Sequence, residues 1–223
     1  MKLIITGTTG MVGEGVLLTC LAHPRVEAVL SVSRRPVGIV HPRLSEYLVA
    51  DFTALKPGDP KLAGYDACLY CAGVSSIGLK EDEFTRLTYD TVMGFAKALS
   101  PQAAMSLVYV SGAGTDGTEK GRTMWARVKG RTENDLMKLP FRQVFAFRPG
   151  FMQAVPGQQR LLKLYKYMAW LASVMKVVTP RWINTLEQVG NAMVEACEQG
   201  YEKRVVEVKD ITALARRAEK LQG

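Results

Sequence analysis

The sequence has little cysteine and almost no histidine. Its 223 residues include four cysteines and two histidines. The histidines, His23 and His41, lie in loop-like contexts without the spacing of metal ligands, so we expect no metal site. Cys68 and Cys71 have CxxC spacing, but residues three apart in a strand point to opposite faces, which argues against a redox pair. We therefore expect buried, free thiols, as in a reducing compartment.

Long hydrophobic runs without charge are also missing. The most apolar segment, Leu161–Val178, contains Lys163, Lys166 and Lys176, so no clean membrane span is predicted. The sequence opens on MKLIITG, a predicted strand that runs into a glycine turn, and we expect no signal peptide before the fold. Internal repeats and low-complexity tracts are absent. These features predict a cytoplasmic protein.

Positive charge is in excess, but it is not concentrated in one stretch. The net charge is +8, and charged residues make up 22% of the chain, too few for a disordered protein. No dense stripe of Lys and Arg alternates with aromatic residues, so we expect no nucleic-acid partner. The basic balance favours a smaller anionic partner, such as a nucleotide cofactor.

Short β-branched segments alternate with helical patterns along the whole chain. The length and the 48% hydrophobic content predict one domain, 1–223, with residues 150–200 contributing a small C-terminal cap over the site. Continuous apolar strands between helices predict an α/β fold, a doubly wound parallel sheet of Rossmann type with helices on both faces. The predicted strands are Lys2–Thr6, Glu27–Ser33, Tyr47–Asp51, Ala67–Ala72, Leu107–Ser111, Val144–Arg148 and Arg204–Lys209. The predicted helices are Met11–Ala22, Glu81–Leu99, Glu119–Leu139, Gln158–Val177, Thr185–Gln199 and Ile211–Leu221.

The first predicted strand ends in the glycine-rich stretch TGTTGMVG. Ligands of parallel sheets bind beyond the carboxyl ends of the strands. A GxxGxxG pattern there permits a tight turn, close approach of a pyrophosphate and close packing of helix on strand. The helix that follows offers unpaired backbone N–H groups to an anion. The residues predicted to bind a dinucleotide here are Gly7, Thr9, Gly10, Met11, Val12 and Gly13.

The second predicted strand ends in SRRP, at the place where an NAD site usually has an acid for the ribose hydroxyls. Here the chain has Ser33, Arg34 and Arg35. A guanidinium can donate two hydrogen bonds to a 2′-phosphate and can stack on an adenine ring. The sequence therefore favours NADP(H), with NAD(H) as the alternative cofactor.

Seven motifs occur in a familiar order: TGTTGMVG, SRRP, VADFTAL, YCAGVSS, LVYVSGAG, VKGRTE and FRPGFM. Over nearly its whole length the chain resembles an atypical member of the short-chain dehydrogenase/reductase superfamily, close to the small NAD(P)H-binding, epimerase-like proteins. The resemblance implies further cofactor contacts. These are Asp51 and Phe52 at the adenine, Cys71, Ala72 and Gly73 along the adenosine ribose, Lys129 at the nicotinamide ribose, and Pro149, Gly150 and Phe151 at the nicotinamide ring. Asp51 is also well placed to cap a helix.

The same resemblance exposes an altered active site in MWARVKGRTEND. In the family, a tyrosine one helical turn before the lysine exchanges the proton, and a serine after the fifth strand polarises a carbonyl. Here Trp125 stands four residues before Lys129, on the same predicted helix face. An indole N–H donates a hydrogen bond but cannot exchange a proton near neutral pH. Gly112 holds the usual serine position, so the predicted catalytic residues are Lys129, Ser111 and Trp125.

Three functions fit this altered site. The first is a carbonyl reductase or epimerase-like enzyme with a displaced acid. The second is a sensor or regulatory protein that binds NADP(H) without turnover. In the third, Trp125 stacks an aromatic substrate or the nicotinamide while a water supplies the proton. The sequence favours an oxidoreductase-type protein of unidentified substrate, and the candidates for a displaced acid are Thr115, Asp116, Tyr109, Tyr165 and Tyr167.

Residues 158–178 show apolar positions at helical spacing. The pattern predicts a cap helix packed over the cofactor cleft. Trp170 and Val174 fall on the lysine-bearing side of that helix, so a contact with a second copy of the chain or with a membrane surface is the alternative. The predicted apolar face consists of Leu161, Leu164, Tyr165, Met168, Leu171, Ala172 and Met175.

Overall fold

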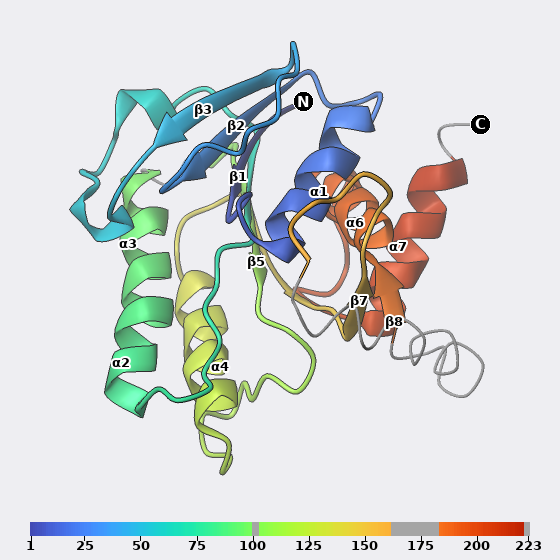
Figure 1. Cartoon of the computed structure of the whole chain (residues 1–223). Helices are drawn as coiled ribbons and strands as arrows, with labels where there is room; N and C mark the ends of the chain where they lie inside the picture. Colours follow the sequence, from blue (N-terminus) through green and yellow to red (C-terminus); the bar gives the residue numbers. More distant parts are fainter. Residues whose placement is uncertain (100–102, 162–182, 221–223) are drawn as a thin grey trace.

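The computed structural model describes residues 1–99, 103–161 and 183–220. Its centre is a seven-stranded sheet in the order β3-β2-β1-β4-β5-β6-β9 (Figure 1). Every neighbouring pair of strands is parallel, which confirms the predicted fold class. The strands are β1 (Lys2–Thr6), β2 (Ala28–Ser33), β3 (Leu44–Leu48), β4 (Ala67–Tyr70), β5 (Ser106–Val110), β6 (Gln143–Arg148) and β9 (Val205–Glu207).

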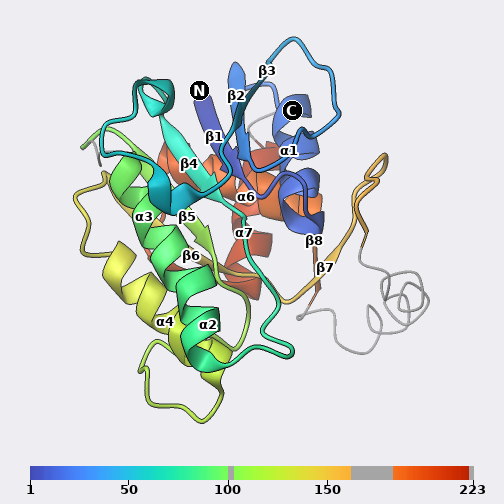
Figure 2. The ribbon, with the colours of Figure 1, turned by 60° about the vertical axis from the view of Figure 1, so that its left-hand side comes forward.

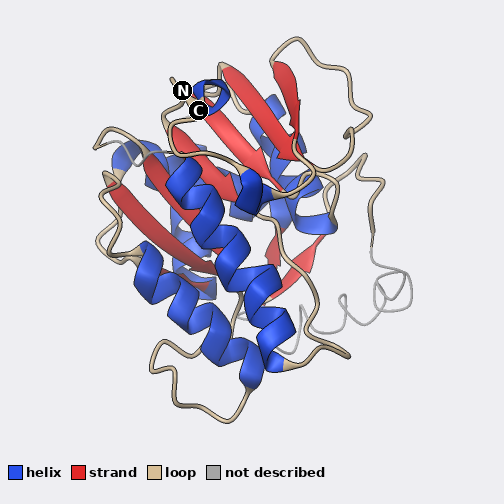
Figure 3. Ribbon diagram, turned by 90° about the vertical axis from the view of Figure 1, so that its left-hand side faces the viewer, coloured by secondary structure: helices blue, strands red, loops and turns tan. Residues whose placement is uncertain are grey.

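Helices cover both faces of the sheet (Figures 1 and 2). One face carries α1 (Met11–Ala22), α6 (Leu186–Gln199) and α7 (Val208–Lys220). The other face, turned to the viewer in Figure 3, carries α4 (Met124–Leu136) and a continuous helix made of three pieces. The three pieces are α2 (Glu81–Thr85), the π-helical turn η3 (Arg86–Asp90) and α3 (Thr91–Ala98), and the β3–β4 connection holds the short 3₁₀ helices η1 (Phe52–Ala54) and η2 (Pro60–Leu62).

The two apolar cores lie on opposite faces of the sheet, because successive side chains of a strand alternate. In β1, Leu3 joins the core beneath α1, α6 and α7, and Ile4 joins the core beneath α3 and α4. Cys68 belongs to the second core and Cys71 packs against the first, so the prediction that they face opposite sides is confirmed. All four thiols are free.

A second, two-stranded sheet lies outside the main one and was not predicted. It pairs β7 (Phe151–Gln153) in parallel with β8 (Ile183–Thr185). Within the stretch 150–200 that was predicted as a cap, α6 is a helix of the core layer, because its buried apolar positions join the core that it shares with α1. Among the residues that the structure describes, no helix is long and apolar enough to cross a membrane.

The predicted helix Gln158–Val177 and the face predicted for 158–178 fall mainly on residues 162–182, which lie outside the described residues. The described beginning of this stretch is not helical. The N–H groups of Gln159 and Arg160 donate to the carboxylate of Glu14 on α1. A side chain from a distant helix therefore fixes the conformation of this stretch.

The predicted boundaries of helices and strands agree best with the structure where neighbouring residues in the sequence determine them. Helix α1 has both ends as predicted. Strand β3 begins at Leu44 rather than Tyr47, because Ser45 and Glu46 of this edge strand interrupt the apolar run that the prediction relied on. Helix α4 begins at Met124 rather than Glu119, because Glu119 has a φ of 62°, which an α-helix cannot contain.

At the C-terminal end, strand and helix meet without a loop. β9 ends at Glu207 and α7 begins at Val208, whereas the prediction extended the strand to Lys209 and began the helix at Ile211. The carboxylate of Asp210 accepts a hydrogen bond from the backbone N–H of Glu207 at 3.2 Å. This bond satisfies an N–H near the start of the helix and allows the early turn into α7.

The topology has a switch point between β1 and β4. These two strands are neighbours, and the chain builds the sheet outward from them in both directions. Such a switch point leaves a crevice beyond the carboxyl ends of the strands, where α/β sheets bind ligands. The hydroxyl of Thr6, at the end of β1, accepts a hydrogen bond from the N–H of Ala72, just after β4, at 3.2 Å. The two strand ends are thereby fixed side by side.

Candidate functional site

The glycine turn after β1 is packed too closely for any side chain. A Cβ on Gly7 would lie 2.6 Å from the backbone nitrogen of Ala72, and Gly7 also has a φ of 70°. A Cβ on Gly13 would lie 2.2 Å from the carbonyl oxygen of Gly7. Gly10 is the N-cap of α1 and donates its N–H to the oxygen of Gly7 at 2.9 Å. The start of α1 is thus held close against the strand ends by glycine backbone, which is the form of turn that fits a pyrophosphate.

A buried hydrogen bond joins this glycine turn to β2. Thr8 and Ser31 share a hydrogen bond between their hydroxyls at 2.7 Å, and both residues are fully buried. The partly buried Thr9, Met11 and Val12 complete the turn. Cys71 lies across the turn at the end of β4, where burial raises the pKa of its thiol to about 12. A thiol with such a pKa stays protonated at neutral pH, so Cys71 acts here as a small packing residue.

The end of β2 presents two exposed arginines. Ser33 is buried, and its hydroxyl donates to the carbonyl oxygen of Arg35 at 2.6 Å. Ser33 therefore shapes the turn rather than facing the crevice. Arg34 and Arg35 are exposed, and within the described ranges neither forms an ion pair. Their guanidinium groups are available to an anion.

Asp51 caps the short helix η1. Its carboxylate accepts hydrogen bonds from the N–H of Thr53 at 2.8 Å and from the Thr53 hydroxyl at 2.7 Å. These bonds, first the one from the hydroxyl, lower the pKa of Asp51. Phe52 is 7% exposed, and its ring lies 4.9 Å from that of Phe95 in the core. The sequence allowed Asp51 either an adenine contact or a capping role, and the structure shows the capping role. Phe52 contributes mainly to packing.

Lys129 and Ser111 meet at the end of β5. The Nζ of Lys129 donates to the backbone oxygen of Ser111 at 2.7 Å. Burial lowers the pKa of Lys129, and the nearby carboxylate of Glu133 acts in the opposite direction. The hydroxyl of Ser111 is 2% exposed and donates to the oxygen of Phe147 on β6 at 3.2 Å. The serine side chain is thus engaged with the sheet, while its carbonyl holds the lysine.

Trp125 lies one helical turn before Lys129, against the loop after β5. A Cβ on Gly114 would be 3.5 Å from the outer edge of the indole ring, so the ring rests beside this glycine. Gly112 and Gly114 have φ values of 103° and 85°, a region that strongly favours glycine. The loop can therefore supply no serine at position 112 without strain. The backbone N–H of Ala113 donates to the oxygen of Pro149 at 2.9 Å, which links this loop to the start of β7.

The described candidates for a displaced acid already have partners. The hydroxyl of Thr115 donates to the oxygen of Gly112 at 2.8 Å. The carboxylate of Asp116 accepts from the Thr118 side chain at 2.6 Å and from the N–H of Gly121 at 2.6 Å, and these bonds lower the pKa of Asp116. Tyr109 is 2% exposed in the core beneath α4, and burial raises its pKa. The remaining two candidates, Tyr165 and Tyr167, lie outside the described residues.

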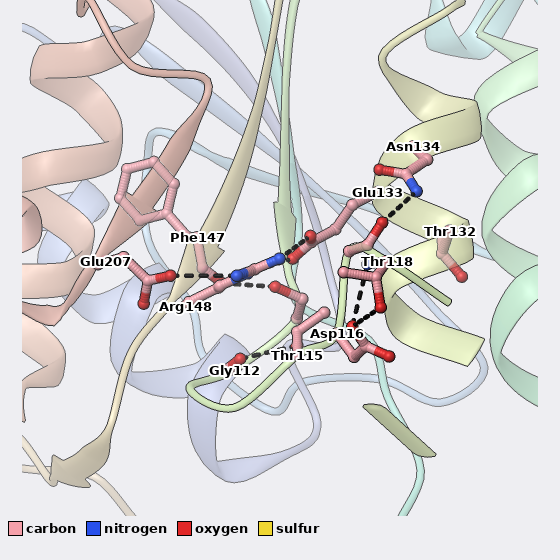
Figure 4. A network of polar contacts seen from close by, with 12 residues as sticks. Gly112, Thr115, Asp116, Thr118, Thr132, Glu133, Asn134, Phe147, Arg148 and Glu207 are labelled. Atoms are coloured by element: carbon pink, nitrogen blue, oxygen red, sulfur yellow. Dashed lines mark hydrogen bonds and ion pairs between the residues drawn. The ribbon is translucent and has the colours of Figure 1, made fainter. Parts of the chain in front are cut away.

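A buried ion pair beside Lys129 was not predicted. Glu133, one turn further along α4, is 1% exposed and accepts two hydrogen bonds from Arg148 at the end of β6 (Figure 4). The distances are 3.0 Å from Nε to Oε1 and 2.5 Å from Nη2 to Oε2. Arg148 Nη1 also contacts Glu207 of β9 at 3.1 Å. The arginine fixes α4, and Lys129 with it, to the sheet. An acid four residues after Lys129, on the same helix face, was the available signal.

The loop 112–121 is fixed to α4 as well. A Cβ on Gly130 would lie 1.8 Å from the backbone oxygen of Asp116, so the loop touches the helix backbone at this glycine. The amide of Asn134 donates to the oxygen of Gly117 at 3.0 Å and to the carboxylate of Glu119 at 2.7 Å. Loop 112–121 is therefore held against the helix that carries Trp125 and Lys129.

No protein-family model matches the sequence. Solved structures show the class of fold. The glucuronic acid dehydrogenase from Chromohalobacter salexigens has a TM-score of 0.67 at 14% identity, covering 92% of this chain and 75% of that chain. The UDP-glucuronic acid 4-epimerase from Bacillus cereus, solved in complex with UDP-glucuronic acid and NAD, has a TM-score of 0.65 at 12% identity, covering 93% and 77%. The chain has the fold of these NAD-binding, Rossmann-type dehydrogenases and epimerases, as the resemblance implied.

Curated sequence relatives come from fungi. Protein FMP52 of Chaetomium globosum is 28% identical over 70% of this chain and 69% of its own length. Protein FMP52 of Coccidioides immitis is 24% identical over 95% of both chains. Both are named as mitochondrial proteins. The cytoplasmic location predicted from the sequence is therefore contradicted, because the relatives point to mitochondria. Cellular addresses are read by receptors and are not a property of the fold.

Proposed function

We propose that the chain binds NADP(H) at the carboxyl edge of the sheet, between β1 and β4. The observation that carries the proposal is the glycine turn at the switch point, where Gly7 and Gly13 leave no room for a side chain and the start of α1 faces the crevice. In this proposal the turn holds the pyrophosphate. Arg34 and Arg35 hold the 2′-phosphate, and Lys129 contacts the nicotinamide ribose. NAD(H) is the weaker ligand, because the end of β2 has no acid for free ribose hydroxyls.

When bound, the cofactor supplies a hydride. A carbonyl reductase must also deliver a proton to the substrate oxygen, and this chain lacks the usual donor. Trp125 cannot release its indole proton near neutral pH. Thr115, Asp116 and Tyr109 are engaged or buried. We therefore propose an oxidoreductase-like protein that retains cofactor binding and has lost the ordinary proton relay.

This arrangement favours a second candidate function, a sensor or regulatory protein that binds NADP(H) without turnover. The supporting observation is that loop 112–121 is fixed to α4 and its polar side chains bind one another. The third possibility, in which Trp125 stacks a ligand, requires the indole to leave its place beside Gly114 or to offer its free face.

Cofactor choice is tested by changing one arginine. Arg34→Ala should weaken NADPH binding by about 1.5–3 kcal/mol, the scale of a charge-assisted hydrogen bond, and should change NADH binding little. Isothermal calorimetry with both cofactors on both proteins measures this. Equal losses for NADPH and NADH, or tighter NADH binding by the parent, would remove the 2′-phosphate assignment. Arg122→Ala, at an exposed arginine of the loop before α4, is the control.

A further inference from the structure

The segment that follows β7 returns to the glycine turn after β1. Residues 154–161 run beside α1, where Glu14 is 3% exposed in the first helical turn. Its two carboxylate oxygens accept the N–H groups of Gln159 at 3.2 Å and Arg160 at 2.6 Å. The side-chain amide of Gln158 donates to the oxygen of Met11 at 2.6 Å. Three consecutive residues of this segment are thus bound to the helix that begins at the predicted pyrophosphate site.

The side chain of Arg160 extends from there to the loop after β2. Its Nη2 donates to the carbonyl oxygen of Val37 at 3.0 Å. Val37 comes two residues after Arg35, so the guanidinium lies beside the stretch that carries Arg34 and Arg35. One acid is close to this stretch, since Glu46 of β3 accepts from the N–H of Val37 at 3.2 Å. Within the described ranges Arg160 has no carboxylate partner.

This placement is unusual for a surface arginine. A guanidinium has five N–H donors, and among the described residues the side chain of Arg160 makes one hydrogen bond, to a neutral carbonyl. The backbone of the residue is fixed by a buried carboxylate, so the side chain is held near the loop at little further entropic cost. An arginine held in this way, beside two exposed arginines, forms a cationic group assembled from two distant parts of the chain.

We propose that Arg160 is a third arginine of the 2′-phosphate site and that segment 154–161 is a clamp on the adenosine end of the cofactor. The proposal rests on the proposed NADP(H) function and adds a residue to it. Glu14 is the positioning residue of the clamp, because it holds the backbone at Gln159 and Arg160. Selectivity for the 2′-phosphate then depends on Arg160 together with Arg34, and binding of the cofactor is coupled to the segment that leads out of β7.

The test is calorimetry of NADPH, NADH and 2′,5′-ADP on the parent and on Arg160→Ala. This substitution leaves the backbone bonds to Glu14 in place, because they use main-chain N–H groups. The affinity for NADPH and 2′,5′-ADP should fall about 10- to 100-fold, the equivalent of one charge-assisted hydrogen bond, with NADH changed by less than about 2-fold. Arg160→Gln, which keeps a polar side chain but removes the charge, should give the same pattern. Arg216→Ala, at an exposed arginine of α7, should change nothing.

The outcomes separate the two proposals. A parent that binds neither NADPH nor NADH overturns the proposed function and this inference with it. A parent that binds NADPH, together with Arg160 variants that bind it equally well, overturns only the clamp. Equal losses for NADPH and NADH in both variants would show that Arg160 supports the fold of the site and not the 2′-phosphate, which also overturns the inference.

Discussion

The two ends of the proposed cofactor site are built from different groups. At the end formed by β1, α1 and β2, the contacts that shape the crevice are mainly backbone contacts between glycines and strand ends. At the end formed by β5, loop 112–121 and α4, side chains bind one another through hydrogen bonds and an ion pair. The first end leaves backbone N–H groups and arginines for a ligand. At the second end, the polar groups hold loop 112–121 and α4 in place. This difference supports the proposal that the chain holds a nucleotide and has lost the ordinary proton relay.

The largest expected effect is on the ion pair of the second end. Glu133→Gln should lower the free energy of unfolding by about 3–5 kcal/mol, because it leaves Arg148 without its buried partner. Urea unfolding followed by circular dichroism measures the change. Glu81→Gln is the matched control. It breaks an ion pair with Arg127 in which the Glu81 side chain is 49% exposed, and it should cost below about 1 kcal/mol. Similar losses in both variants would mean that Glu133 is not a structural anchor of α4.

At the first end, the glycine packing is open to a direct test. Gly13→Ala should destabilise the protein by about 1–3 kcal/mol and weaken NADPH binding, because the new Cβ would meet the oxygen of Gly7 at 2.2 Å. Gly73→Ala is the control for stability, since a Cβ there meets nothing within 4 Å. Thermal unfolding and NADPH titration of both variants give the answer. A Gly13→Ala protein as stable as the parent would show that the turn is looser than described.

The smallest effect concerns the buried lysine. The pKa of Lys129 is lower in the folded protein than its usual 10.5, so the unfolded chain binds the proton more tightly. Stability should therefore rise as pH increases from below the folded pKa to 10.5, and level off above it. Lys129→Met removes this contribution. The difference in unfolding free energy between parent and variant, measured across that window, isolates it from other titrating groups. A difference that stays constant with pH would show that the lysine is well solvated.

The sequence predicted those parts of the two ends whose contacts join residues close together in the chain. The glycine turn and α1 depend on residues close together in the chain, and both were placed correctly. The bonds of Glu133 to Arg148 and of Glu14 to Arg160 join separate elements, and no local pattern specifies such partners. A faint signal existed in each case. Glu14 is a lone charge inside the apolar helix MVGEGVLLTCLA, and Glu133 shares a helix face with Lys129.

The active-site prediction shows the same limit. The tryptophan at the usual tyrosine position was visible in the sequence, because the four-residue spacing to Lys129 is local. The sequence could not show that the Ser111 hydroxyl donates to the oxygen of Phe147. It also could not show that Gly112 has a positive φ, which a serine would adopt only with strain. These depend on how the ends of β5 and β6 meet. For this reason a repair of the site should change Trp125 and leave Gly112 as it is.

The central claim is that cofactor binding survives while the proton relay is missing, and one assay addresses it most directly. NADPH oxidation is measured on a panel of ketones and aldehydes with the parent, Trp125→Tyr and Trp125→Phe, each shown by calorimetry to bind NADPH. We expect a slow or inactive parent, an equally slow Trp125→Phe, and a rate at least about 10²-fold higher in Trp125→Tyr, because a phenol beside Lys129 can supply the proton. A parent that reduces a carbonyl rapidly, and is slowed by Trp125→Tyr, would contradict the account and make Trp125 a working part of another mechanism.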